Sequence, residues 1–267
     1  MMRSLWTAAS GMKAMQFSVD TIANNLANVS TTAYKKEKPE FEDLLYVTMQ
    51  QAYSDGENVR PVNLQVGHGV VARANVRDFS MGNLEQTGNK LDMAIQGDGF
   101  FVVRGPDGNP YYTRDGSFKI SMTDMGKMLA TSKGYPVLDR DGLEIFIESD
   151  LDDLQIQSTG EITYRDPETG ITIPTGQYIG LFQFENVQGL EAVGGNLFVN
   201  NSASGEPIPD YETANPSIIR TEFLEASNVQ VVEEMVRLIT AQRAYELNSK
   251  AITTSDEMLQ TANNLRR

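Results

Sequence analysis

The sequence predicts an α+β protein in which a long helix at each end of the chain flanks an antiparallel, all-β middle. Two observations support this class: apolar residues recur at helical spacing near both ends, and the middle alternates short β-prone runs with glycine-containing turns. The charge follows the same division. Residues 37–223 carry 13 basic and 29 acidic residues, a net of −16, against +3 for residues 1–36 and −1 for residues 224–267. The chain therefore combines a solvated acidic body with two nearly neutral packing segments.

An apolar heptad pattern predicts the N-terminal helix. Its flanks hold small residues, including Gly11 and Ser18 on one side and Ala9 and Ala23 on the other, which would let neighbouring helices approach closely. The heptad positions are Leu5, Ala8, Met12, Met15, Val19, Ile22, Leu26 and Val29.

The C-terminal helix is predicted to run from Ser227 to Leu265. Ser227 followed by Gln230 has the form of a capping box, and neither Pro nor Gly interrupts the residues that follow. Two neighbouring stripes indicate two different packing partners, and a surface helix with one wide apolar face is the alternative. The first stripe is Leu238, Ala241, Tyr245, Asn248, Ile252, Ser255, Leu259 and Ala262. The second stripe is Ala244, Leu247, Ala251, Thr254, Met258, Thr261 and Leu265.

The predicted organisation has three parts. Residues 1–36 and 224–267 form a terminal helical assembly domain, in which the two helices pair in a coiled-coil-like inner layer. Residues 37–70 form an extended or hairpin-like connector, and residues 71–223 form the β-rich outer domain. Because the connector is long for a simple loop in a compact domain, it should have a role of its own.

The β domain is predicted from nine short β-prone runs. Asp-Gly or Gly-rich turns separate several of them, which is typical of an antiparallel sandwich or barrel-like body. The predicted strands are residues 70–76, 91–95, 100–104, 111–113, 118–120, 144–147, 154–157, 161–164 and 178–184.

Three asparagines lie close together near the end of the N-terminal helix. Asn24, Asn25 and Asn28 occupy about one and a half turns, although Asn is a mediocre helix former. Interhelical amide hydrogen bonds that fix the register of the helices would account for them. A solvated helix surface is the alternative.

Catalytic chemistry has few candidate residues in this chain. His68 is the single histidine, it lies between two glycines as in an ordinary turn, and the chain has no cysteine. Residues 139–144 partly resemble a calcium-binding loop but lack its pattern of ligands, so a hairpin turn is expected there. We therefore predict no catalytic, cofactor-binding or metal-binding residue. A secreted hydrolase that uses two of the many carboxylates is a rival reading.

The composition also bears on partners and location. An acidic surface makes nucleic acid and anionic membranes poor partners. No stretch approaches the roughly 18 consecutive apolar residues of a membrane span, so no direct membrane insertion is expected. The N-terminus lacks the apolar core and cleavage site of a secretory signal peptide. Export, if it occurs, must use a signal that is not cleaved.

Seven short motifs are distributed over the whole chain. They are MMRSLW at 1–6, IANNLANV at 22–29, FEDLLY at 41–46, DMAIQGDGFF at 92–101, YTRDGSF at 112–118, SNV at 227–229 and QRAYELNSK at 242–250. Together they resemble the bacterial flagellar rod and hook family, and within it the distal rod proteins of the basal body. The start of the chain and the insert near residues 46–66 favour distal rod over proximal rod or hook. One position departs from the family pattern, because Ala33 stands where the family usually has Gly, which bears on the turn geometry there.

The resemblance implies a structural, non-enzymatic subunit of the distal rod. It implies export through the flagellar type III apparatus without signal cleavage, and polymerisation under a rod cap into a helical tube. This tube would act as a drive shaft that transmits torque to the hook. It also implies junctions with proximal rod and hook-junction proteins, and rotation inside the ring bushing of the cell envelope. A proximal rod or hook subunit is the alternative within the family, and an adhesin that forms a closed oligomer is a rival outside it.

The candidate site is a subunit interface on the terminal helices. Because each helix pair has more apolar surface than one monomer can cover, we expect the helices to be largely disordered in the free subunit and to pack on assembly. The expected interface residues are Leu5, Met12, Val19, Ile22, Asn24, Asn25, Leu26, Asn28, Val29, Val232, Ile239, Gln242, Arg243, Tyr245, Asn248, Ile252 and Leu259.

Overall fold

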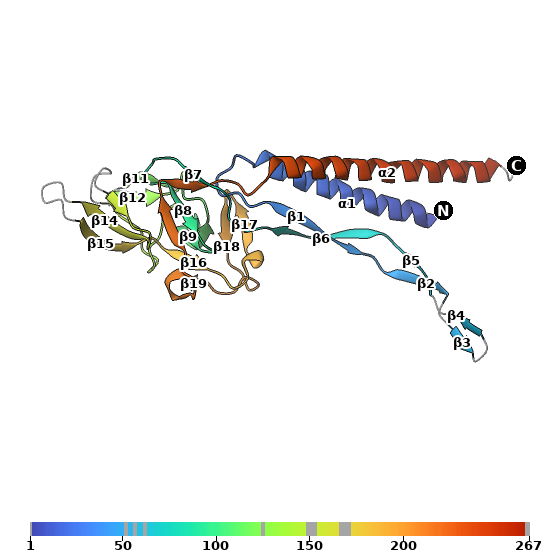
Figure 1. Cartoon of the computed structure of the whole chain (residues 1–267), viewed down its shortest axis with the longest axis horizontal. Coiled ribbons are helices and arrows are strands. Elements are labelled where there is room, and N and C mark those ends of the chain that lie inside the picture. The colour runs from blue at the N-terminus through green and yellow to red at the C-terminus, as the bar shows by residue number, and fades with distance from the viewer. Residues whose placement is uncertain are drawn as a thin grey trace. The chain divides into compact units, whose positions relative to one another are not determined.

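The fold is α+β, with one helix at each end of the chain and antiparallel strands between them (Figure 1). The computed structural model describes residues 2–50, 53–55, 58–60, 63–123, 126–147, 154–165 and 172–264. The chain divides into two compact units. The helix–hairpin unit comprises Met1–Ala27, Glu37–Arg77 and Gln230–Arg267, and the β unit comprises Asn28–Lys36 and Asp78–Val229. The connector thus groups with the helices, and residues 28–36 group with the β strands.

Two long helices, α1 (Met2–Ala27) and α2 (Val231–Asn264), run antiparallel to each other. The predicted N-terminal helix extends beyond the end of α1, and the predicted end of the C-terminal helix, Leu265, lies outside the described residues. Val29 lies in a turn after α1, and α2 begins four residues later than the proposed cap at Ser227. The reason lies in the local bonding of Ser227, whose Oγ accepts a hydrogen bond from the amide of Val229 at 3.3 Å and so closes a turn.

Where it is described, the connector consists of antiparallel strand pairs, and its returning strand continues to Arg77. The hairpin packs on α1, because the amide of Val70 donates to Ser10 Oγ at 3.3 Å. Its antiparallel pairs are β1 (Glu37–Asp43) with β6 (Val70–Arg77), β2 (Tyr46–Gln50) with β5 (Leu64–Gly67), and β3 (Tyr53–Asp55) with β4 (Asn58–Arg60).

The largest sheet of the β unit has six strands, in the order β17-β18-β10-β9-β16-β19. They are β9 (Phe100–Arg104), β10 (Pro110–Thr113), β16 (Leu181–Gln183), β17 (Glu191–Gly194), β18 (Leu197–Val199) and β19 (Ile208–Pro209). The smaller sheets pair β7 (Leu84–Gln86) with β21 (Phe223–Glu225), β8 (Met93–Gln96) with β20 (Ile218–Thr221), β11 (Lys119–Thr123) with β12 (Gly126–Ala130), and β13 (Leu154–Ile156) and β15 (Thr172–Tyr178) with β14 (Glu161–Arg165). Short 3₁₀ helices form at Val187–Gly189 and Asp210–Glu212.

Most of the predicted strands coincide with observed strands within a few residues. The strand predicted at residues 144–147 does not form, because only isolated bridges are present there, at Glu144 and Phe146. The predicted strand 178–184 is divided between the end of β15 and β16. Strands β7, β12, β17, β18, β19, β20 and β21 of the β unit were not predicted. All of these except the five-residue β12 have two to four residues, which carry too little periodicity to be recognised.

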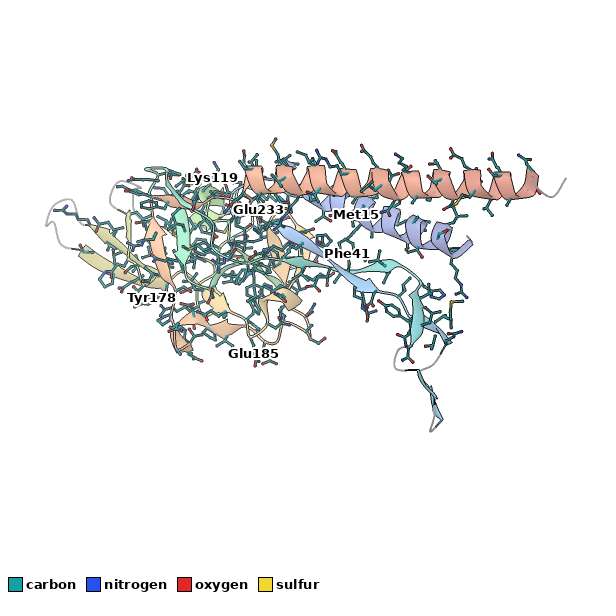
Figure 2. The ribbon with its side chains drawn as sticks, turned by 45° about the vertical axis from the view of Figure 1, so that its right-hand side comes forward. Met15, Phe41, Lys119, Tyr178, Glu185 and Glu233 are labelled. Atoms are coloured by element: carbon teal, nitrogen blue, oxygen red, sulfur yellow. The ribbon has the colours of Figure 1, made fainter. Side chains whose placement is uncertain are left out.

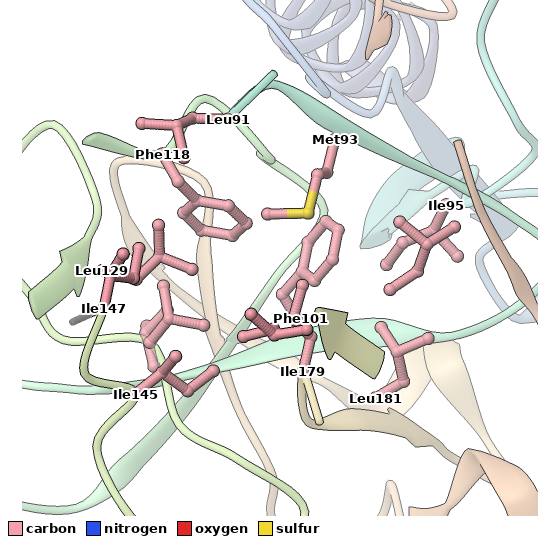
Figure 3. Close-up of a cluster of buried hydrophobic side chains, with 14 of the residues drawn as sticks. Leu91, Met93, Ile95, Phe101, Phe118, Leu129, Ile145, Ile147, Ile179 and Leu181 are labelled. Carbon is pink, nitrogen blue, oxygen red and sulfur yellow. The ribbon is translucent and has the colours of Figure 1, made fainter. Parts of the chain in front are cut away.

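Strand β9 is buried on both faces and therefore joins two hydrophobic clusters. Phe101 and Val103 point into a larger cluster with Met93, and Figure 3 shows Phe101 beside Met93 and Phe118. Phe100 and Val102 belong to a second, aromatic-rich cluster on the opposite face. This alternation follows from the period of two residues in a strand. The Phe101 and Phe118 rings meet edge to face, with centroids 5.0 Å apart.

Candidate assembly interface of the terminal helices

One stripe of α2 is covered by α1 within the single chain. Ala241 and Ser255 are buried, and Asn248 and Ile252 are half-buried. Two contacts record how closely the helices approach: a Cβ added at Gly11 would lie 3.0 Å from Asn248 Nδ2, and Ser4 Oγ lies 3.5 Å from Ser255 Oγ. These positions of the first predicted stripe thus find their partner in the same molecule, whereas Tyr245 of that stripe is exposed. Small residues at the contact permit the close approach.

The rest of the apolar surface of α2 is uncovered. Val232, Leu247 and Ile239 have exposed fractions of 76%, 69% and 50%. Figure 2 shows side chains along the face of α2 that is turned away from α1. Single exposed apolar residues are ordinary, whereas a row of them along one helix marks an interaction surface. The other large apolar side chains exposed on α2 are Val231, Met235, Val236, Tyr245 and Met258.

The expectation that a single chain cannot bury both apolar stripes of α2 therefore holds for the second stripe only. Both terminal segments are helical in the single chain, and they cover part of each other's apolar surface. The second stripe is exposed at Leu247, Ala251, Thr254 and Met258. The surface that needs a partner is consequently smaller than the sequence alone suggested.

Asn25 is the buried asparagine of the three, and it joins three elements. Its Nδ2 donates to the carbonyl oxygen of Glu37 in β1 at 2.8 Å and to Glu234 Oε2 in α2 at 3.2 Å. Its Oδ1 accepts from the amide of Glu37 at 2.9 Å. The interhelical bond predicted for these asparagines thus exists at Asn25, with a carboxylate as its partner. Because both ends of the amide are used, Asn25 fixes the hairpin and α2 against α1.

The other two asparagines lie in different surroundings. Asn24 is exposed on α1, and Asn28 lies in the turn after the helix, where its Oδ1 accepts from Thr31 Oγ1 at 3.2 Å. Glu234 also approaches Arg237, whose Nη1 lies 3.6 Å from Glu234 Oε1. Arg237 also forms an i,i+4 ion pair with Glu233, in which Nη2 lies 2.6 Å from Glu233 Oε1.

The remaining predicted interface residues fall into two groups. Those exposed in the single chain are Val232, Ile239, Gln242, Arg243 and Tyr245. Those partly or fully covered are Leu5, Met12, Val19, Ile22, Leu26, Val29, Asn248, Ile252 and Leu259, of which Ile22 is the most buried. Residues of the first group are free to contact another molecule, and residues of the second group act first within the chain.

A groove in the helix–hairpin unit is lined by both helices. It has a volume of about 550 Å³ and is bounded by Gln16 and Val19 of α1 and by Gln242, Tyr245 and Glu246 of α2. Its lining of an aromatic ring, an aliphatic side chain and amide groups suits a side chain from another helix better than a small charged ligand.

Sequence reasoning did not assign the apolar residues of the hairpin to the interface. Leu45 is 88% exposed, and Tyr46, Met49 and Leu64 are also exposed. The FEDLLY motif at 41–46 was the available signal, because it places several large apolar residues in an otherwise polar segment. Their exposure makes the hairpin a second apolar surface of the helix–hairpin unit.

The side chains considered for catalysis or metal binding have local structural roles. His68 lies in the hairpin, where its Nδ1 is 3.0 Å from the carbonyl oxygen of Leu45. Residues 139–144 form the predicted turn, in which the amide of Gly142 donates to the carbonyl of Asp139 at 3.0 Å. Within the part of the chain that the structure describes, no three His, Cys, Asp or Glu side chains are grouped to hold a metal ion. Neither described helix has the length and hydropathy of a membrane span.

Three family models match separate parts of the chain. A flagella basal body rod protein model matches residues 5–35, a flagellar hook protein FlgE/F/G D1 domain model matches residues 94–164, and a flagellar basal body rod FlgEFG protein C-terminal model matches residues 220–265. All three describe components of the flagellar rod and hook, and the matches fall on α1, part of the β unit and α2 in the order of the chain.

Full-length relatives narrow the class. The chain is 47% identical to the flagellar basal-body rod protein FlgG of Borreliella burgdorferi over 100% of both chains. It is 41% identical to FlgG of Buchnera aphidicola subsp. Schizaphis graminum, over 99% of this chain and 100% of the relative. A crystal structure of Helicobacter pylori flagellar hook protein FlgE2 aligns at 17% identity with a TM-score of 0.25, over 50% of this chain and 43% of the hook chain. The chain belongs to the FlgG family of flagellar basal-body rod proteins and is a structural subunit of the rod.

Proposed function

We propose that the chain polymerises into the distal part of the rod, a helical tube that carries torque from the motor to the hook. In this proposal α1 and α2 form the coiled-coil-like inner layer, the hairpin stiffens the tube, and the β unit faces outward. The observation that carries the proposal is the row of exposed apolar side chains on α2, which the chain itself leaves uncovered. Surface of this kind needs a partner that a second copy of the same helix pair can supply.

The physical driving force is the burial of this row on neighbouring subunits. A fully buried Val, Leu or Ile side chain contributes about 1.5–3 kcal/mol relative to an exposed one, so several such residues offset the entropy lost on association. In this proposal the row packs on a different surface of the neighbouring subunit, which makes the contact heterologous. A heterologous contact that does not close produces an open helical assembly.

The acidic β unit complements this role. Its residues 28–36 and 78–229 carry 11 basic and 24 acidic residues, a net charge of −13, so unassembled subunits repel one another and remain dispersed until their helices dock. The proposed partners are further copies of the chain, proximal rod and hook-junction proteins, the rod cap during assembly, the envelope ring bushing and the type III export apparatus. The proposed location is the basal body within the cell envelope, reached without a cleaved signal peptide. A structural role requires no cofactor and no catalytic residue.

The test compares two substitutions that each place a carboxylate on an exposed apolar residue. Ile239→Asp changes the exposed row of α2, and Met122→Asp changes a 76% exposed residue of β11 in the β unit. We expect Ile239→Asp to raise the concentration needed for assembly at least ~10-fold, because a buried carboxylate replaces a buried isoleucine. Met122→Asp should assemble like the unchanged protein. Electron microscopy and sedimentation of the concentrated protein give the readout.

Two outcomes contradict the proposal: fibres from Ile239→Asp at the normal concentration, or a closed oligomer of fixed size from the unchanged chain. Ile22→Asp is a weaker test, because Ile22 is already buried within the chain and its substitution would also disrupt the helix–hairpin unit. Circular dichroism of the dilute Ile239→Asp protein verifies that its helices still form.

A further inference from the structure

The chain passes between its two units four times, and the residues on the β-unit side of these crossings are bonded to one another. The crossings follow Ala27, Lys36, Arg77 and Val229. We propose that a buried cluster centred on Lys35 and Glu225 is a clasp, which resists tension along the chain and binds the segments next to all four crossings into one cooperative element of the β unit. Its resistance to tension in a rotating rod rests on the proposed function, whereas the clasp itself is a property of the isolated subunit.

The centre of the clasp is a buried ion pair. Lys35 Nζ lies 2.6 Å from Glu225 Oε1, and their exposed fractions are 2% and 1%. Lys35 Nζ also donates to the carbonyl oxygen of Ser80 at 2.8 Å, and the amide of Gly82 donates to Glu225 Oε1 at 2.8 Å. One carboxylate and one ammonium therefore join segments 28–36, 78–82 and 225–229. These groups are far apart in sequence, since Lys35 and Glu225 are separated by 190 positions.

Asn228 repeats the connection nearer to the crossings. Its Oδ1 accepts from the amide of Lys36 at 2.8 Å, and its Nδ2 donates to the carbonyl oxygens of Asp78 at 2.7 Å and Ser80 at 3.2 Å. The amide of Asp78 donates to the carbonyl of Lys36 at 2.9 Å. The last residue before one crossing is thus bonded to the first residue after another, and Asn228 holds both. Two independent side chains make the same three-way connection.

Backbone bonds close the element. The amide of Ala33 donates to the carbonyl of Glu225 at 2.7 Å, and the amide of Asn228 donates to the carbonyl of Tyr34 at 3.3 Å. Segments 28–36 and 225–229 are therefore attached through main chain as well as side chains.

Arg114 anchors the clasp to the core of the β unit. Its Nη1 lies 3.7 Å from Glu225 Oε2, and its Nη2 donates to the carbonyl of Gly97 at 2.8 Å. Its guanidinium carbon lies 5.0 Å from the centroid of the Phe100 ring in β9. Glu225 thus holds two buried cations, one from a crossing segment and one from beside the central sheet. Tension applied to the chain at the crossings is therefore transmitted to β9, the strand that contributes to both hydrophobic clusters.

The composition of the clasp explains why it should open as one element. Removing the charge of Glu225 takes away the carboxylate that the two buried cations Lys35 and Arg114 share, so the penalty falls on every segment that they touch. An apolar contact of the same size has no directional bonds, so the segments that it joins would separate gradually. The clasp therefore either holds all the segments or releases them together.

The experiment measures amide hydrogen exchange in the full-length, unassembled chain. Glu225→Gln keeps the shape of the side chain and removes its charge, and Glu144→Gln is the matched control in a half-exposed ion pair with Arg104 of the same unit. We expect Glu225→Gln to accelerate exchange at the amides of Ala33, Gly82 and Asn228 together, by ~100-fold. The amide of Leu138, which donates to Val102 in the core, should change far less. Glu144→Gln should change none of the three clasp amides.

Two results would overturn the clasp. If Glu225→Gln accelerated amide exchange at Gly82 alone, Glu225 would only form a local hydrogen bond. If it accelerated exchange at Leu138 equally, the substitution would destabilise the whole β unit. Should Glu225→Gln not fold, Asn228→Ala removes the second connection without disturbing a buried charge. It should then accelerate the amides of Ala33 and Gly82, which do not bond to its side chain, and unchanged rates there would equally refute the proposal. Because exchange is measured on dispersed subunits, the result does not depend on whether fibres form.

Discussion

Gly11 of α1 lies against the side-chain amide of Asn248 in α2, so closely that a Cβ at residue 11 would be 3.0 Å from Nδ2 and 3.2 Å from Oδ1. A glycine inside a helix costs about 1 kcal/mol relative to alanine, and this contact accounts for its presence. The close approach also identifies which side of α1 receives α2. A larger residue at position 11 therefore tests this contact, because it improves helix propensity, which stabilises the pair, but overpacks the contact, which destabilises it.

We expect Gly11→Leu to lower the stability of the helix pair by ~1–2 kcal/mol, because overpacking of the contact outweighs the gain in helix propensity. Lys13→Leu adds an apolar side chain to an exposed position of the same helix and should change stability by less than about 0.5 kcal/mol. Thermal unfolding followed by far-ultraviolet circular dichroism measures both. A higher melting temperature for Gly11→Leu would show that the helices do not pack at this point.

The neighbouring asparagines allow the same substitution in two surroundings. Asn25→Asp replaces the Nδ2 donor by a carboxylate oxygen, which faces the carbonyl of Glu37 and the carboxylate of Glu234. We expect a loss of about 3 kcal/mol in the free energy of unfolding, because a buried charge meets a like charge. Asn24→Asp, on the exposed side of the same turn, should cost less than about 1 kcal/mol. Urea unfolding measures both, and equal effects would contradict the role assigned to Asn25.

The two long helices could be predicted because their periodicity extends over many turns without Pro or an interior cap. Their ends could not, since Ser227 and Asn228 use their side chains in bonds outside the helix. The stripe of α2 that is covered by α1 could not be distinguished from the exposed stripe, because both have the same spacing. The helix residue Asn25 was recognised as unusual, whereas its main-chain partner in β1 required the folded structure.

The buried charges were the least predictable feature of the chain. In the sequence Lys35 and Glu225 resemble the surface charges around them, and their partners are brought together by tertiary structure alone. Arg114 lies within the YTRDGSF motif, so the resemblance marked its segment without giving its role. The hairpin was predicted as a connector with a role of its own, yet the exposure of Leu45 and Met49 depends on how its strands pair.

Ala33 occupies a backbone conformation that favours glycine, with φ of 56°, although it is buried. This agrees with the glycine that the family usually has at this position. The left-handed region costs an L-residue roughly 1–2 kcal/mol, which Ala33→Gly should recover. The same change also removes a buried methyl group and adds freedom to the unfolded chain, both of which destabilise.

A matched control separates these contributions. Ala130→Gly removes an equally buried methyl group from β12 without a left-handed backbone. We therefore expect the unfolding free energy of Ala33→Gly to lie about 1–2 kcal/mol above that of Ala130→Gly. Chemical denaturation of both variants measures the difference. Equal values would mean that the turn at Ala33 carries no strain.

Tyr112 makes the stability of the β unit depend on pH. Burial raises the pKa of its hydroxyl to about 12, from an ordinary value of 10. Between these values the unfolded chain releases the proton and the folded chain retains it, so the unfolded state binds fewer protons. The contribution of Tyr112 is therefore fully present below about pH 10 and is lost as the pH rises toward 12. The maximum slope for one proton is about 1.4 kcal/mol per pH unit.

Tyr112→Phe isolates this contribution, because the remaining tyrosines titrate in both proteins. We expect the unfolding free energy of the unchanged chain to fall more steeply between about pH 10 and pH 12 than that of Tyr112→Phe, with a difference in slope approaching ~1.4 kcal/mol per pH unit. Urea unfolding at several pH values supplies both curves. Parallel curves would show that Tyr112 ionises as readily in the folded chain as in the unfolded one.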